Sequence, residues 1–117
     1  MSKIIINTFS IIFINLFIIS CGSKSTFDIN KARVNIDKQN KKYMKFYNNG
    51  DASGVVELHS DDALVMPPNT DMVKGKSLIK KAISYAISAG ATDLAFTTVN
   101  MYGNEEFVTE VGRYSLN

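Results

Sequence analysis

The chain has 117 residues, a net charge of +2 from 13 Lys and Arg against 11 Asp and Glu, one His and one Cys. So small a charge excludes the strongly basic surface that nucleic-acid binding needs. A single cysteine excludes a disulfide framework or a Cys-rich metal site within one chain, and a single histidine excludes a site built from two imidazoles. The composition therefore predicts neither a metal nor a cofactor.

The first twenty residues predict a secretory signal peptide, because Lys3 supplies a positive start and residues 4–19 are dominated by Ile, Phe and Leu. Spanning a bilayer takes about 20 mainly apolar residues, so this interrupted run is marginal as a permanent span. The exit, Ile18-Ile19-Ser20-Cys21, resembles the lipobox of bacterial lipoproteins, whose cysteine is lipidated and becomes the new N-terminus. The alternative is a plain signal anchor with an incidental cysteine.

As a lipoprotein, the chain divides into a signal peptide at residues 1–20, a small and polar tether at residues 21–26, and one domain at residues 27–117. A diacylglycerol thioether on Cys21 would hold the protein durably on a membrane, since each buried CH₂ contributes about 0.8 kcal/mol. The sequence therefore predicts a location in the bacterial cell envelope, with the membrane as a partner through the lipid anchor.

Residues 28–49 have the period of an amphipathic helix, with Asp28 as its N-cap and Gly50 after its end. Its apolar face carries Ile36, Tyr43 and Tyr47. The opposite face carries Lys31, Lys38, Lys42 and Lys45. This row of lysines is either a docking surface for anionic lipid or acidic partners, or the solvated face of the helix.

Asp51 is placed to cap a short second helix over residues 52–59. A brief apolar segment at residues 63–66 ends at two prolines, and a strand fragment is expected near Val73. Residues 77–89 have a broad apolar band and predict a third helix.

The period changes to two over residues 94–101 and 107–115, which are rich in Phe, Thr, Val and Tyr and predict two strands. Gly103-Asn104 between them favours a hairpin. Helices followed by antiparallel strands predict an α+β fold.

The ordered set of segments 43–51, 58–63, 67–68, 74–76 and 110–114 resembles the nuclear-transport-factor-2-like (NTF2-like) superfamily, and within it the SnoaL-like and DUF4440 proteins. The resemblance covers residues 27–117. It implies a cone in which a curved antiparallel sheet packs on about three helices around a pocket, and it implies that homodimers are common. Relatives usually continue with two more strands, which often carry Trp. This chain stops at Asn117 and contains no Trp. The resemblance therefore implies either a shortened sheet or a fragment.

Ketosteroid isomerase, a catalytic member of the superfamily, combines an aspartate base with a tyrosine and a second acid that stabilise the oxyanion. Tyr43 occupies the matching place for the tyrosine. Pro67 stands at the base position, and the second acid would fall beyond Ser115. The resemblance therefore argues against isomerase activity.

The candidate pocket residues are Tyr43, Tyr47, His59, Met66, Glu110 and Tyr114. The two tyrosines of the first helix present hydroxyls to a ligand or are core aromatics. Glu110 is either a pocket carboxylate capable of general-base work or a solvated strand residue, and strand parity does not decide between the two. His59 lies at the end of the short helix, where a cation or a hydrogen bond meets free carbonyls, and a lone histidine with no paired nucleophile is usually structural.

The preferred hypothesis is a membrane-tethered NTF2-like domain that binds a small apolar or amphipathic ligand, or a protein partner, without catalysis. A SnoaL-like enzyme that transfers protons with Glu110, Tyr43 or His59 is the first alternative, and a truncated, non-functional product is the second. Convergence of those three side chains in one pocket would favour the enzyme.

Overall fold

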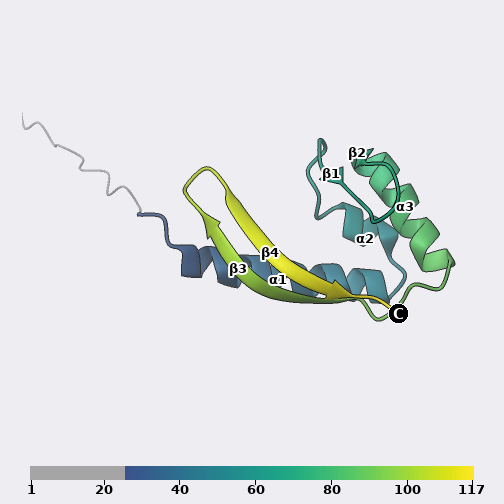
Figure 1. Ribbon diagram of the computed structural model, residues 1–117, viewed down its shortest axis with the longest axis horizontal. Helices are drawn as coiled ribbons and strands as arrows, with labels where there is room; N and C mark the ends of the chain where they lie inside the picture. The colour runs from purple at the N-terminus through teal and green to yellow at the C-terminus, as the bar shows by residue number, and fades with distance from the viewer. Residues whose placement is uncertain (1–25) are drawn as a thin grey trace, which may run out of the picture.

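The computed structural model of the chain describes residues 26–117. The predicted signal peptide, Cys21 and the tether up to residue 25 lie outside the described residues. The elements follow in the order α1 Ile29–Asn48, α2 Ala52–Val56, β1 Leu64–Val65, β2 Val73–Lys74, α3 Lys76–Ser88, β3 Ala95–Gly103 and β4 Val108–Ser115. The predicted α+β fold, with three helices and antiparallel strands, is confirmed (Figure 1).

Local capping explains where the first two helices begin. The Asp28 carboxylate accepts hydrogen bonds from the backbone N–H groups of Asn30 and Lys31, and the Asp51 carboxylate accepts one from Gly54. Gly50 takes a φ of 75° directly after the C-cap of α1, which lets the chain turn at once into α2.

Helix α2 is shorter than the expected 52–59 segment. The N–H of Glu57 still bonds four residues back to Ser53, but those of Leu58 and His59 bond only three residues back. The helix therefore tightens and ends at Val56, and His59 lies in the turn that follows.

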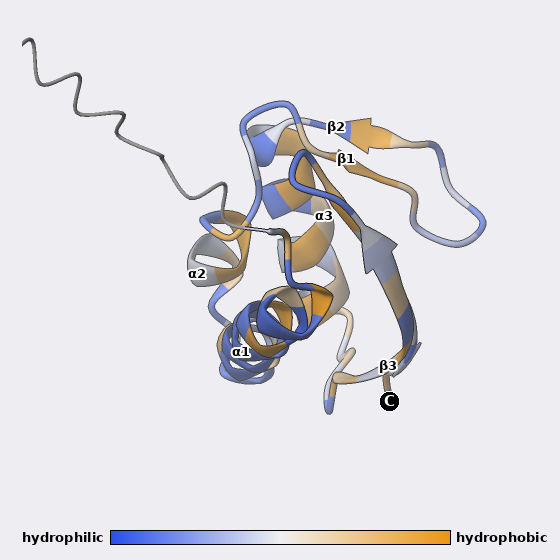
Figure 2. Cartoon of the chain, turned by 90° about the vertical axis from the view of Figure 1, so that its left-hand side faces the viewer, coloured by the Kyte–Doolittle hydropathy of each residue, from blue (hydrophilic) through white to orange (hydrophobic). Residues whose placement is uncertain are grey.

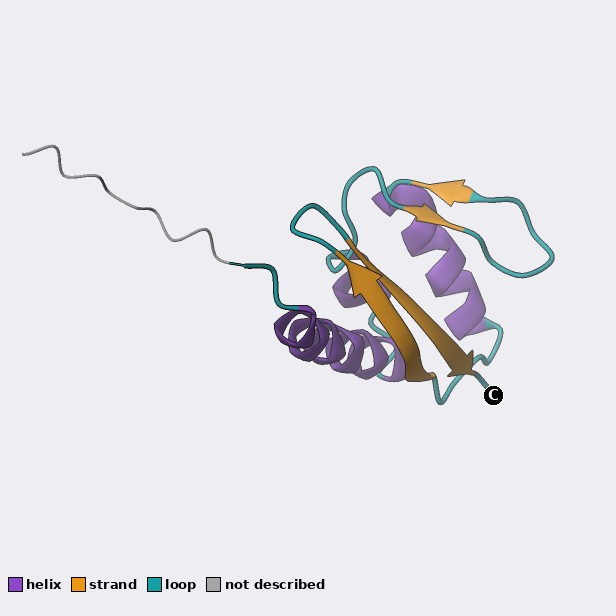
Figure 3. Cartoon of the chain, turned by 60° about the vertical axis from the view of Figure 1, so that its left-hand side comes forward, coloured by secondary structure: helices purple, strands orange, loops and turns teal. Residues whose placement is uncertain are grey.

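The β3–β4 hairpin lies along α1, while the short β1–β2 hairpin lies beside α3 (Figures 1 and 3). Leu64 pairs with Lys74 in the first hairpin, and Phe96 pairs with Tyr114 in the second. The family resemblance implies one curved sheet, whereas the strands of residues 26–117 form two separate two-stranded sheets. In this part of the chain β4 bonds to β3 along one edge, and its other edge carries no strand.

The hydrophobic core lies where the three helices meet the start of β3. Val55 and Ile79 are the largest fully buried side chains, at 0% and 1% exposure. The remaining buried members of this cluster are Tyr47, Ala52, Val56, Ile83 and Leu94. In Figure 2, where α1 is seen nearly end-on, blue hydrophilic residues cover most of its outward surface. The predicted lysines of that face are all exposed.

None of the helices in residues 26–117 combines the length and the apolarity needed to cross a bilayer.

Asn48 joins the end of α1 to the start of β3. Its amide donates to the Leu94 carbonyl at 3.1 Å, and its Oδ1 accepts from the Leu94 N–H at 2.8 Å. Because Leu94 is buried, we expect Asn48→Ala to leave both backbone groups unpaired and to lower the free energy of unfolding by about 1–3 kcal/mol. Denaturant unfolding measures this loss. Asn49→Ala is the matched control and should cost less than about 0.5 kcal/mol; equal losses would contradict the bridging role.

Candidate functional site

A cavity of about 200 Å³ lies between α1 and the β3–β4 hairpin. Asn40 contributes from the helix, and the two strands contribute the rest of the wall. The lining residues are Asn40, Phe96, Thr97, Glu110, Gly112, Arg113 and Tyr114. The wall therefore combines aromatic side chains with an amide, a hydroxyl, a carboxylate and a guanidinium group.

A β-bulge in β3 decides which residues face this cavity. Thr98 pairs with Gly112 but Asn100 pairs with Val111, so Val99 is an extra residue on β3. The bulge shifts the alternation, and Phe96, Thr98 and Met101 share the face turned toward α1. We call this the inner face of the hairpin.

The inner face extends to β4 through the strand pairs. Directly paired residues lie on the same face, and Phe96, Thr98 and Met101 pair with Tyr114, Gly112 and Glu110. The backbones come close together at the glycine, where an added Cβ would lie 3.0 Å from the Thr97 carbonyl oxygen. In the structure Glu110 therefore faces inward. The alternation of residues along β4 does not by itself decide this.

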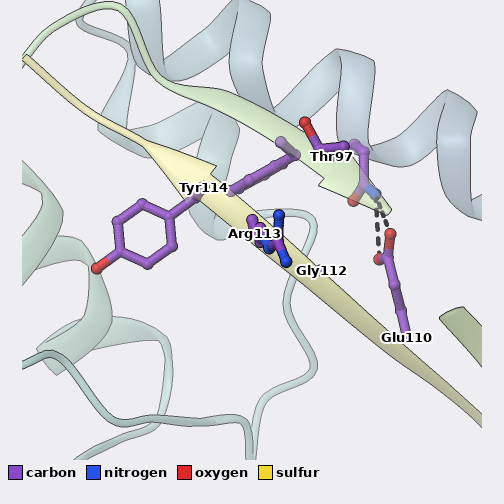
Figure 4. Close-up of a pocket in the computed structure, with 7 residues that line it drawn as sticks. Thr97, Glu110, Gly112, Arg113 and Tyr114 are labelled. Carbon is purple, nitrogen blue, oxygen red and sulfur yellow. Dashed lines mark hydrogen bonds between the residues drawn. The ribbon is translucent and has the colours of Figure 1, made fainter. Parts of the chain in front are cut away.

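Three hydrogen bonds hold the Glu110 carboxylate. The Asn40 amide nitrogen donates to Oε1 at 2.8 Å and to Oε2 at 3.1 Å (Figure 4), and the Thr98 hydroxyl donates to Oε1 at 2.5 Å. Both donors are neutral. The ion pairs found in residues 26–117 join Lys76 to Glu57 and to Asp61, and none involves Glu110. The carboxylate is therefore fixed in position while its charge has no ionic partner within this region.

Tyr43 and His59 form a separate aromatic group. The Tyr43 ring lies 5.7 Å from the His59 ring and 5.2 Å from the Phe96 ring, measured between centroids. Burial, with a smaller contribution from Tyr47, raises the pKa of Tyr43 above its usual value, so its hydroxyl stays neutral. The Nδ1 of His59 lies 3.1 Å from the Val55 carbonyl oxygen, which can only accept, so Nδ1 carries the proton.

The remaining candidates lie elsewhere. Tyr47 is 7% exposed within the core, where burial raises its pKa, and Met66 is 79% exposed just after β1. The structure therefore brings Glu110 and Tyr114 to one cavity. The lining of that cavity does not include Tyr43, Tyr47, His59 or Met66.

Sequence reasoning missed Asn40, Phe96 and Thr98. A signal for Asn40 is present, since it lies one turn after Ile36 and one turn before Tyr43 on the apolar face of α1. A polar residue at such a position usually has a specific partner, because burying an amide without one is costly. Thr98 carries no comparable signal, because its orientation depends on the position of the bulge.

No cluster of three or more His, Cys, Asp or Glu side chains that could hold a metal ion occurs in residues 26–117.

No known family profile matches the sequence, and no curated protein matches it. Among solved structures, the chain is similar to a ketosteroid isomerase-like protein from Erwinia carotovora atroseptica, with a TM-score of 0.53 and 17% identity. The similarity covers 74% of this chain and 82% of that one. The fold is NTF2-like. At 17% identity the likeness concerns the fold alone, so the chemistry of this domain follows from its own residues.

Proposed function

We propose that the protein is a membrane-tethered NTF2-like domain that binds a small apolar or amphipathic ligand in the cavity beside Glu110, without catalysing a reaction on it. The observation that carries the proposal is the Glu110 carboxylate, fixed by Asn40 and Thr98 at the wall of a cavity that also has aromatic residues. Ligand sites typically combine an apolar wall with a few fixed polar groups in this way.

The tether is proposed from the sequence. Ile18-Ile19-Ser20-Cys21 supplies the lipobox-like exit, and lipidation of Cys21 would place the domain in the bacterial cell envelope, on a membrane. The domain begins with α1 at Ile29, so only a few residues separate the proposed anchor from the folded part. A ligand of the cavity would then be bound close to the membrane surface.

Proton-transfer catalysis is the second candidate, because a fixed carboxylate beside a cavity can act as a base. An isomerase of the ketosteroid kind needs a base together with oxyanion donors. The ring of Tyr43 packs at a tilt against His59 and Phe96 and is not part of the cavity lining, and Pro67 cannot abstract a proton. Binding without catalysis therefore accounts better for the arrangement.

Titration of the full chain in a non-ionic detergent with phenethyl alcohol, a small neutral amphipathic probe, tests the binding function. We expect the backbone NMR signals of Glu110 and Gly112 to shift on addition of the probe. Tyr114→Ala should weaken binding up to about tenfold, since an aromatic contact contributes about 0.5–1.5 kcal/mol beyond its area. Tyr85→Ala, which removes a 78%-exposed tyrosine of α3, is the matched control and should leave binding unchanged.

Two results would overturn the proposal. Shifts spread evenly over the surface, with equal effects of the two tyrosine variants, would remove the binding function. Turnover of a β,γ-unsaturated ketosteroid by the wild-type protein at an enzyme-like rate would remove its non-catalytic character. We expect wild type and Pro67→Asp both to stay near background in that assay, because a base alone does not supply the oxyanion stabilisation, often the largest contribution.

A further inference from the structure

We infer that the ligand of this cavity carries a cationic ammonium group, bound at Glu110, on a small aromatic or aliphatic body; the inference rests on the proposed function. The charges that face the cavity support this ligand. The lining residues contributed by α1 and by the inner face of the hairpin are Asn40, Phe96, Glu110, Gly112 and Tyr114. Among these, Glu110 alone is charged.

Arg113 also lines the cavity, but it belongs to the other face of the hairpin. It pairs with Thr97, one position along from the pair of Phe96 and Tyr114, and successive strand residues point to opposite faces. Arg113 is exposed, and no ion pair between it and Glu110 is present in the described part of the chain. The charge that a ligand meets on the inner face is therefore negative.

The hydrogen bonds of Glu110 leave room for a further donor. Oε1 accepts from both Asn40 and Thr98, whereas Oε2 accepts one longer bond from Asn40. An ionised carboxylate offers about four lone-pair sites, so Oε2 can accept an additional N–H. Bonds between an ammonium and a carboxylate are about twice as strong as those between neutral groups. An ammonium would supply both the missing donor and the missing countercharge.

The aromatic part of the wall suits the same ligand. Phe96 and Tyr114 lie directly opposite each other on the paired strands, and Gly112 lies between Tyr114 and Glu110 along β4. Figure 4 shows the Tyr114 ring and the Glu110 carboxylate at the two ends of this stretch, with Gly112 and the sticks of Arg113 drawn between them. Aromatic faces attract cations and also pack against apolar groups. A head group at Glu110 thus allows the body of the ligand to extend across Gly112.

The cavity volume limits the size of the ligand. At about 200 Å³ the cavity is smaller than the roughly 300–1,000 Å³ typical of ligand pockets, which suits a single ring with a short amine arm. A neighbouring groove shares Asn40 and Phe96 and is lined by Arg33, Asp37 and Lys41. The two basic residues of that groove would favour an anion instead, so the test includes an anionic probe.

The experiment compares three probes of similar size on the full wild-type chain in a non-ionic detergent: phenethylammonium, phenethyl alcohol and phenylacetate. We expect phenethylammonium to bind at least about tenfold more tightly than the alcohol, as one charge-assisted contact would give. Glu110→Gln should abolish this preference. Glu105→Gln, which removes an equal charge from the exposed hairpin loop, should keep it.

The outcomes separate the inference from the function on which it rests. If phenethyl alcohol binds as tightly as phenethylammonium, or if phenylacetate binds most tightly, the ammonium inference is wrong while ligand binding stands. If none of the three probes binds at the cavity, the binding function itself fails. The comparison on the wild-type chain needs no variant, so it decides the inference even if Glu110→Gln does not fold.

Discussion

Replacing Ile79 by Asp is expected to abolish the folded state of the domain. Ile79 lies on the inner side of α3 at 1% exposure and belongs to the cluster that joins all three helices. A carboxylate placed there would have no partner, and burying an unpaired charge costs several kcal/mol. Domains are stable by only about 5–15 kcal/mol in total, and this one is small. Circular dichroism of the variant should therefore show loss of the cooperative thermal transition.

The adjacent residue supplies the control for this prediction. Leu78 precedes Ile79 on α3 but is 49% exposed, so Leu78→Asp keeps its carboxylate in water and should retain the transition. Ile79→Ala is a milder substitution at the same position. It should lower the free energy of unfolding by about 2–5 kcal/mol because of the cavity that it leaves. Similar losses for Ile79→Asp and Leu78→Asp would mean that α3 presents a different face to the core.

Replacing Cys21 by Ser is expected to move the protein from the membrane fraction to the soluble fraction or to leave it unprocessed. Serine has no thiol, so the diacylglycerol thioether cannot form, and the acyl chains that would anchor the protein are lost. Fractionation of cells that express the full chain, followed by intact-mass measurement, checks both parts of the prediction. Ser23→Ala, two residues into the tether, is the matched control and should stay with the membrane.

The mass of the wild-type protein decides the outcome. A diacylglycerol adduct on Cys21 supports the lipoprotein, whereas an unmodified cysteine on a membrane-bound chain supports the plain signal anchor. This result is independent of the cavity, because the proposed anchor and the proposed ligand site lie in different parts of the chain. A protein could therefore lose its anchor and still bind its ligand.

The helices, and most of their ends, were readable from the sequence because their causes are local; the end of α2 at Val56 was not. Asp28 and Asp51 cap helices through hydrogen bonds that span two or three residues, and Gly50 relieves backbone strain at one position. Alternation and turn residues likewise predict β3 and β4. The α+β fold follows from this order of elements, and the structural likeness to an NTF2-like protein agrees with it.

The depth of burial was harder to predict on α3. The apolar band of this helix includes both Leu78 and Ile79, yet Leu78 is half-exposed and Ile79 is fully buried. Hydrophobicity marks both positions equally. What separates them is the direction from which α2 packs against α3, and that packing involves residues distant in the sequence.

The sequence by itself determined the type and order of the elements, the α+β class and the lipobox-like exit, because each depends on neighbouring residues. Only the tertiary structure decided that Glu110 faces inward. The bulge at Val99 sets the register of β3 against β4, and the amide that holds the carboxylate comes from Asn40, 70 residues away in the chain. A strand carrying Val108, Glu110, Gly112 and Tyr114 on one face has no local preference for which face is buried. The position of the helix against which the hairpin packs decides which face is buried.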